Sequence, residues 1–259
     1  ESGGCMREAN REIRWLFLVV GCCISSVVAY AQPSIPKQDI PSNASVQVRK
    51  QLERLWGEDA REKCDAAERL GRMGKRAAAA VPFLASMFAD ESSYHLWPEG
   101  GISVRECVAS ALSQLGEPGF EALVAALAQR EPYVRAKAAE YLGISRNPRA
   151  IPALSAALWQ QGYGDESDVP FARQSMVWAL GKLRAIEPLI EALRDDDLRF
   201  AAGQALAEIG RPALPWLIKT SETSDPEIHA CADEILQVIR SKKRELETPR
   251  GACSGWKRS

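Results

Sequence analysis

Histidine, aromatic residues and net charge are all scarce in this chain. Only two of its 259 residues are histidine, His95 and His229, and aromatic residues make up 7% of it. So few histidines, with no Cys-x-x-Cys pair near them, do not indicate a zinc site. The P-loop and the motifs Gly-x-Gly-x-x-Gly and Gly-x-Ser-x-Gly are absent as well. We therefore expect a non-enzymatic protein with no catalytic residues, no metal and no cofactor.

The formal net charge is only -1, which weighs against nucleic acid as a partner. A protein that binds a phosphate backbone is expected to carry a basic stripe or patch. Basic residues gather only near the C-terminus, at Lys242–Arg244 and Lys257–Arg258. We predict that residues 241–259 form a basic, flexible tail.

Residues 1–31 have the pattern of a few upstream residues followed by a cleaved signal peptide. A start at Met6 leads into three arginines, an apolar stretch and a small-x-small cleavage site: Arg7, Arg11 and Arg14, then Trp15–Val28, then Ala29–Ala31. The apolar run is shorter than the roughly 20 residues that span a bilayer. We expect export to the periplasm or the extracellular space, without a transmembrane helix in the mature chain.

A second interpretation of the same segment stays open. Val19-Val20-Gly21-Cys22 resembles a bacterial lipobox, in which the cysteine is acylated and becomes the mature N-terminus. That route would anchor the protein to the envelope by lipid at Cys22. A mature mass that begins at Gln32 would reject it.

From Val46 to about Arg240 the chain repeats one phrase. In Tyr133–Gly143 an apolar residue precedes Arg135, small residues follow, and Leu142 comes seven residues after the arginine. Similar phrases occupy Val104–Leu112, Leu198–Leu206, Lys63–Gly71 and Arg173–Gly181. Each is followed by a second apolar phrase, at Val81–Leu84, Phe120–Val124, Ile151–Leu154, Ile186–Ile190 and Leu214–Ile218.

The spacing within these phrases predicts pairs of amphipathic helices. Apolar residues three and four apart form one stripe on a helix. Prolines fall at or near the starts of the second helices, where a missing N–H costs little. Glycines near the ends of the first helices are expected to close the last turn in a left-handed conformation: Gly71, Gly74, Gly116, Gly143, Gly181 and Gly210. Helix pairs of this kind bury their apolar faces by stacking.

The combination Val134-Arg135, Ala138-Ala139 and Leu142-Gly143, followed by Ala150-Ile151-Pro152 and Leu154, resembles the HEAT-like repeats of the phycobilisome-lyase type, relatives of HEAT and armadillo repeats. The resemblance covers about Glu58 to Arg240. It implies an all-α, right-handed α-α superhelix (an α-solenoid) of about five helix-pair repeats. Capping helices are expected from Ser45 to Trp56 and from Asp225 onward, behind an extended linker at residues 32–44.

The intervals between equivalent leucines reveal two insertions. Leu112 to Leu142 spans 30 residues and Leu180 to Leu206 spans 26, whereas Leu70 to Leu112 spans 42 and Leu142 to Leu180 spans 38. The extra residues lie at 91–101 and 161–170. They carry Tyr94, His95, Trp97, Tyr163, Asp165 and Glu166, and Trp159 lies two residues before the second insertion. We predict that these loops form a rim that binds a protein partner. The alternative is that Trp97 and Tyr163 only cover helix ends.

The second helices are expected to line the concave side of the stack. Their predicted outward residues carry both signs of charge: Glu121, Gln129, Glu187, Glu191, Arg194 and Lys219. The repeated basic residues Arg105, Arg135, Arg173 and Arg199, with His229 in the same place, are predicted to pair with acids or carbonyls of neighbouring units. We call these, with Lys63, the basic positions.

Four cysteines follow the predicted cleavage site: Cys64, Cys107, Cys231 and Cys253. Cys107 and Cys231 take equivalent places, two residues after a basic position. We interpret both as small core residues and predict no disulfide.

These observations favour an exported protein-binding scaffold in a bacterial envelope. The alternative is a lyase-like chaperone or enzyme subunit that resembles the phycobilin lyases and holds a tetrapyrrole. The resemblance also includes a hydroxylase branch that binds iron through His-Glu pairs. Neither His95 nor His229 is followed by glutamate, which excludes that branch.

Overall fold

A computed structural model describes residues 34–96, 100–160, 169–222 and 225–247. The predicted signal peptide and Cys22 lie outside the described residues, as does Cys253. Short 3-10 helices occur at η1 (Lys37–Asp39), η2 (Gly74–Ala80), η3 (Met87–Ala89), η4 (Pro148–Ala150) and η5 (Arg211–Ala213).

The described chain is built from consecutive helix pairs. The first helices of the pairs are α3 (Ala60–Met73), α5 (Val104–Gln114), α7 (Pro132–Ile144), α9 (Val169–Lys182) and α11 (Asp196–Ile209). The second helices are α4 (Val81–Ser86), α6 (Glu117–Ala126), α8 (Ile151–Leu158), α10 (Ile186–Ala192) and α12 (Leu214–Ser221). The pairs are preceded by α2 (Val46–Arg54) and followed by α13 (Pro226–Glu247).

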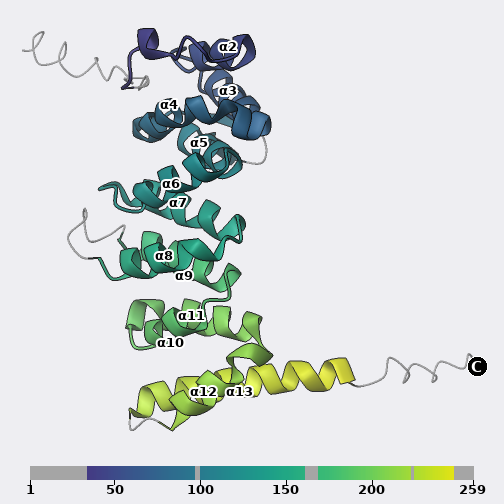
Figure 1. Ribbon diagram of the computed structural model, residues 1–259. Helices are drawn as coiled ribbons and strands as arrows, with labels where there is room; N and C mark the ends of the chain where they lie inside the picture. The colour runs from purple at the N-terminus through teal and green to yellow at the C-terminus, as the bar shows by residue number, and fades with distance from the viewer. Residues whose placement is uncertain (1–33, 97–99, 161–168, 223–224, 248–259) are drawn as a thin grey trace, which may run out of the picture. The chain divides into compact units, whose positions relative to one another are not determined.

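The pairs pack in the order of the chain (Figure 1). Contacts run from α2 to α3 and then along the first helices α3, α5, α7, α9, α11 and α13, each touching the next. Each second helix packs on a first helix of its own or the next repeat, and α4 also touches α6 as α10 touches α12. The predicted all-α solenoid, with helices capping both ends, is confirmed.

The repeated leucines form the core of this stack. Leu70, Leu112, Leu142, Leu180 and Leu206 are each 0% exposed. Burying such a side chain contributes about 1.5–3 kcal/mol relative to leaving it in water. All five belong to one continuous cluster of buried side chains that runs through the repeats, as expected when stacked repeats stabilise one another.

The prediction for the glycines is confirmed at three positions and wrong at the other three. Gly74, Gly116 and Gly210 have φ of 58°, 76° and 73°. Gly71, Gly143 and Gly181 lie inside α3, α7 and α9. At Gly143 an added Cβ would lie 2.8 Å from the Ala179 Cα of α9, so a missing side chain lets two helices approach closely. After α7 and α9 the left-handed conformation falls instead on Arg146 and Arg184, with φ of 51° and 58°.

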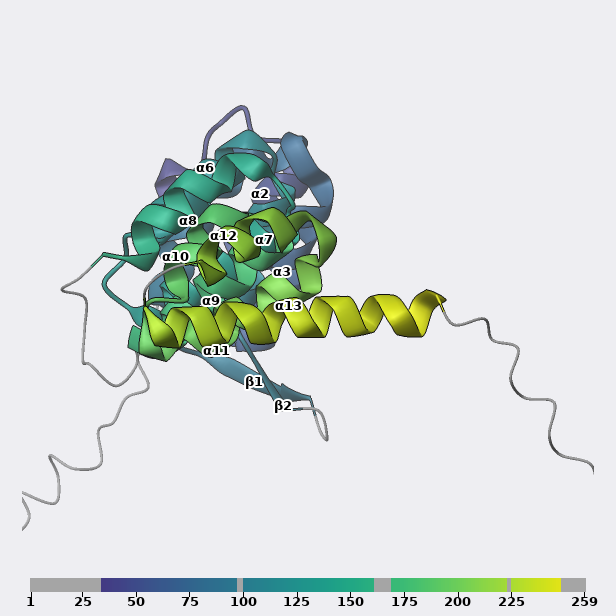
Figure 2. The ribbon, with the colours of Figure 1, turned by 90° about the horizontal axis from the view of Figure 1, so that it is seen from below.

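The first insertion is a β-hairpin, whereas the sequence analysis expected a loop. Strands β1 (Ser93–Leu96) and β2 (Gly100–Ser103) pair antiparallel, with Tyr94 opposite Ile102 and His95 opposite Gly101. β1 contacts α3 and β2 contacts α5. Figure 2 shows the hairpin projecting on the side of the first helices.

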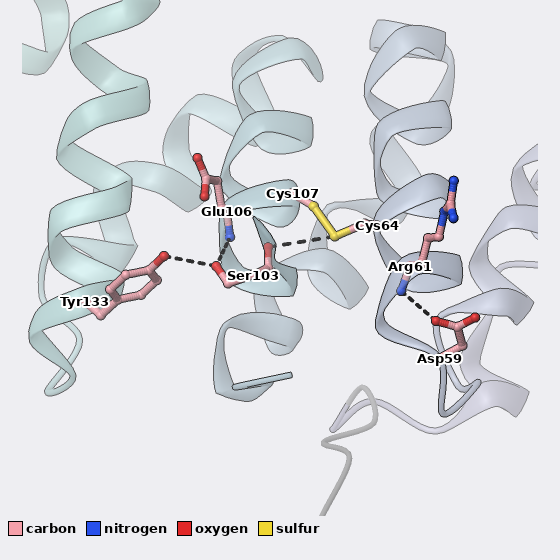
Figure 3. Close-up of a disulfide and its surroundings, with 7 residues drawn as sticks. All are labelled: Asp59, Arg61, Cys64, Ser103, Glu106, Cys107 and Tyr133. Carbon is pink, nitrogen blue, oxygen red and sulfur yellow. Dashed lines mark hydrogen bonds between the residues drawn. A yellow bond between two sulfur atoms is a disulfide. The ribbon is translucent and has the colours of Figure 1, made fainter. Parts of the chain in front are cut away.

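A disulfide joins Cys64 of α3 to Cys107 of α5, so the prediction that Cys107 is an unbridged core residue is wrong. The physical reason is that α3 and α5 lie side by side. Cys64 follows its basic position by one residue and Cys107 by two, which places them on facing flanks with Cα atoms 5.2 Å apart (Figure 3). Cys231, in the place equivalent to Cys107, is a free, half-buried thiol.

Helix α13 continues to Glu247, past the predicted end of the repeat domain at Arg240. The tail was expected to begin at residue 241, and the helix therefore takes in its first residues. Figure 2 shows the C-terminal part of α13 extending beyond the other helices. Within the described ranges, no helix combines the length and the apolar character needed to cross a bilayer.

Candidate protein-binding surfaces

The basic positions face inward and bind neighbouring backbone and carboxylates. Arg135 donates to the carbonyls of Gln129 and Arg130, both at 3.0 Å. Arg173 donates to the Leu158 carbonyl at 3.2 Å and pairs with Asp195. Arg199 donates to the Leu193 carbonyl at 2.9 Å and lies 3.3 Å from a Glu227 oxygen. In each case the cation binds carbonyls at the end of the preceding second helix or just after it, where the helix dipole and the unpaired carbonyls favour a positive charge.

The remaining basic positions also bind carboxylates or backbone carbonyls. Lys63 Nζ lies 2.6 Å from Asp90 Oδ2, and both side chains are almost fully buried. Arg105 pairs with Glu91 at 2.9 Å and approaches Glu131 at 3.7 Å. His229 Nδ1 contacts the Ser221 carbonyl oxygen, and its Nε2 lies 3.4 Å from Asp233. The structural interpretation of these residues, predicted from their repetition, is confirmed.

A cavity with a volume of about 290 Å³ lies at the base of the β-hairpin. It is lined by Glu91, Ser93, Gly101, Ser103, Arg105 and Tyr133. Ser103 Oγ lies 3.0 Å from the Tyr133 hydroxyl and accepts the Glu106 N–H at 3.2 Å (Figure 3). Among the described residues, Arg105 Nε is buried without a hydrogen-bond partner.

The structure describes only part of the predicted rim. Tyr94 is half-buried and packs against the core together with Ile102. Trp159 ends α8, is 36% exposed, and has the Arg173 guanidinium 5.5 Å from its ring. The backbone of His95 lies in β1. Trp97, Tyr163, Asp165 and Glu166 lie outside the described residues.

The second helices present the mixed surface that the sequence predicts. All six predicted outward residues are exposed: Glu121, Gln129, Glu187, Glu191, Arg194 and Lys219. Beside them on α12, Trp216 is 38% and Ile218 is 45% exposed. On α6, Glu121 belongs to an ion-pair group in which Arg149 reaches Glu117 at 2.6 Å and Glu121 at 3.4 Å. We call these exposed residues the second-helix face.

Exposed aromatic residues on the first helices were missed by the sequence analysis. Phe171 and Trp178 on α9 are 49% and 41% exposed, and Phe200 on α11 is 76% exposed. Phe171 stacks on Tyr133 with ring centroids 6.5 Å apart, and Lys182 Nζ lies 5.2 Å from the Trp178 ring. The sequence could have indicated this exposure, because these aromatic residues are not among the apolar positions of the repeats that form the buried stripe of each helix.

A groove with a volume of about 600 Å³ runs between α11 and α13. The small residues in its lining are Gly203, Ala207 and Ala230, and the larger apolar residues are Phe200, Ile235 and Val238. The charged residues are Asp196, Arg199, Glu227 and Glu234, and Gln204 and Cys231 complete the lining. Burial raises the pKa of the Cys231 thiol above its ordinary value. We call this feature the α11/α13 groove.

The comparison with protein families settles what these helix pairs are. The model described as HEAT repeats matches residues 101–181 and 121–197, which hold the pairs from α5 to α10. Residues 101–197 are HEAT repeats. A fold alone does not determine function, so the activity depends on the residues displayed on the surfaces of the stacked pairs.

Several solved structures resemble this chain at low identity. The complex of CpcE and CpcF of phycocyanin lyase from Nostoc sp. PCC7120 matches with 23% identity and a TM-score of 0.43, covering 80% of this chain and 82% of that one. An engineered protein matches with 20% identity and a TM-score of 0.38, covering 76% and 99%. The designed armadillo repeat protein YIII(Dq)4CqI matches with 18% identity and a TM-score of 0.35, covering 73% and 98%. Comparison with curated proteins gives no match.

Proposed function

We propose that this protein is an exported, non-enzymatic scaffold that binds a protein partner in a bacterial envelope. The observation that carries the proposal is the second-helix face, which exposes Trp216 and Ile218 on α12 and charged residues of both signs along α6, α10 and α12. Tryptophan set within a polar surround is typical of the residues that contribute most to protein interfaces. The exposed residues of these helices carry both signs of charge, whereas a nucleic-acid-binding surface is expected to be basic.

Two observations support export. The sequence of residues 6–31 has the order of charge, apolar run and cleavage site of a signal peptide. The Cys64–Cys107 disulfide is of a kind that persists in oxidising compartments and is rare in the cytosol. Cell fractionation followed by intact-mass measurement tests this part. We expect a mature chain that starts at Gln32 and contains one disulfide. A lipidated chain that starts at Cys22 would mean that the protein is anchored to the envelope. A reduced chain in the cytosol would refute export.

The binding surface is tested by comparing two tryptophan variants. Trp216→Ala is expected to lower recovery of the partner in crosslinking and affinity purification from the native envelope by about 30-fold, the effect of losing a contact worth about 2 kcal/mol. Its melting temperature should fall no further than that of Trp178→Ala, because the two side chains are similarly exposed, at 38% and 41%. Trp178→Ala, on the first-helix side, is the matched control and should retain binding. Equal losses in both variants, or no loss in either, would refute the assignment to the second-helix face.

The rim remains part of the proposal. Trp97→Ala and Tyr163→Ala should weaken partner recovery without lowering the melting temperature if the inserted segments bind. A fall in melting temperature with unchanged recovery would mean that these rings cover helix ends instead.

A further inference from the structure

The α11/α13 groove differs from two earlier interfaces between first helices. Between α3 and α5 the flanks are joined by the Cys64–Cys107 disulfide. Between α5 and α7 they are joined by Lys137, whose Nζ lies 3.7 Å from Glu106 Oε1. Each bridge joins two residues with the same relation to the basic positions. One is the residue directly after the basic position of the first helix, and the other lies two residues after the basic position of the following helix. At α11 and α13 the equivalent residues are Phe200 and Cys231, which both line the open groove.

The groove is suited to an apolar side chain with positive charge beside it. Phe200 is 76% and Val238 is 39% exposed, and small residues from both helices make room between them. The charged lining comprises three acids and one base. Arg199 pairs with Asp196 at 2.6 Å and with Glu227 at 3.3 Å, so the lining as a whole stays acidic.

We propose that this groove binds residues 252–258 of the same chain, with Trp256 between Phe200 and Val238 and with Lys257 and Arg258 beside Glu234. The segment that follows α13 has matching chemistry. Residues 248–259 contain Arg250, Lys257 and Arg258, a single tryptophan, and no acidic residue. Opposite charges steer and orient such a segment, and an indole ring brings a large apolar area to the groove.

The sequence after α13 also contains a turn motif. Thr248-Pro249-Arg250-Gly251 places proline second and glycine fourth, the order favoured in a type I turn. The proposal requires a turn at this point, which would direct the following residues back along α13 toward the groove.

The register of the returning segment follows from chain geometry. Extended residues advance about 3.3 Å each, so the five steps from Gly251 to Trp256 cover about 16 Å. A helix rises 1.5 Å per residue, so 16 Å corresponds to about 11 residues of α13. Counting back from Glu247 places Trp256 near Leu236, between the groove residues Ile235 and Val238. Lys257 then lies level with Glu234, and Arg258 lies about 3.3 Å further along α13.

The free thiol of Cys231 provides a probe inside the groove. The full-length protein is treated with iodoacetamide, and the rate at Cys231 is read by peptide mass spectrometry, which separates it from the other cysteines. Trp256→Ala is expected to raise this rate about tenfold, as when a contact formed about 90% of the time is lost. Trp256→Phe should fall between the two, because it keeps part of the apolar area.

Controls separate this explanation from others. Trp178→Ala, on α9, should leave the rate at Cys231 unchanged, and wild-type protection should not depend on protein concentration. Equal rates in wild type and Trp256→Ala would overturn the proposal. So would acceleration by both tryptophan variants, which indicates general loosening, or protection that grows with concentration, which indicates the tail of a second copy.

Discussion

Removing the Cys64–Cys107 disulfide tests how the N-terminal repeats are held together. The bond closes a loop with a sequence separation of 43 residues. In the chain-entropy model a loop of that size constrains the unfolded state by about 4 kcal/mol at 25 °C. Both cysteines lie in the stack, where Cys64 is 3% exposed, so alanine replaces each with a modest loss of packing.

The assay is urea unfolding of wild type and of the double variant Cys64→Ala, Cys107→Ala, with and without reductant. With a slope of about 3 kcal/mol per molar urea, the loss of 4 kcal/mol lowers the midpoint by about 1 M. Reductant should lower the wild-type midpoint similarly and leave the double variant unchanged. Cys231→Ser is the control and should keep the sensitivity of wild type to reductant. A wild-type midpoint that ignores reductant, together with titration of Cys64 and Cys107 as free thiols, would refute the reasoning.

Three further predictions concern single side chains. Leu142→Ala should cost about 2–5 kcal/mol in urea unfolding, whereas Ile144→Ala, at a side chain that is 52% exposed, should change stability by less than about 0.5 kcal/mol. Lys63→Met should cost about 3–5 kcal/mol at pH 7, because it leaves the buried Asp90 carboxylate without its cation; calorimetry that shows no loss would contradict this. Alkylation of Cys231 should reach half its maximal rate at a higher pH than that of an exposed cysteine in a short peptide, because burial raises the pKa of the thiol and the thiolate is the reactive form.

Most of the fold could be predicted from the sequence because each repeat has the same helical spacing of apolar residues. Apolar residues at helical spacing predict the buried stripes, and Leu142, for example, is fully buried as expected. The basic positions were also interpretable, since a cation repeated once per unit indicates a contact repeated once per unit. Arg135 and Arg173 bind the expected carbonyls.

The features that were missed depend on the packing between neighbouring helices. Cys107 and Cys231 both lie two residues after a basic position, which suggested that they have the same role. The disulfide instead joins Cys107 to Cys64, which lies one residue after the basic position of the facing helix. Gly143 lies inside α7 because the approach of α9 requires a missing side chain there. The exposure of Phe200 follows from the open flank of α11, which no pattern within a single repeat determines.

The disulfide also has a mechanical consequence. When the described chain is pulled from its two ends, the residues between Cys64 and Cys107 carry no tension while the bond is intact. At about 3.4 Å per extended residue they represent roughly 150 Å of contour length. Stretching a single oxidised molecule should therefore release that much less extension than stretching a reduced one, and the hairpin inserted between α4 and α5 stays slack under load.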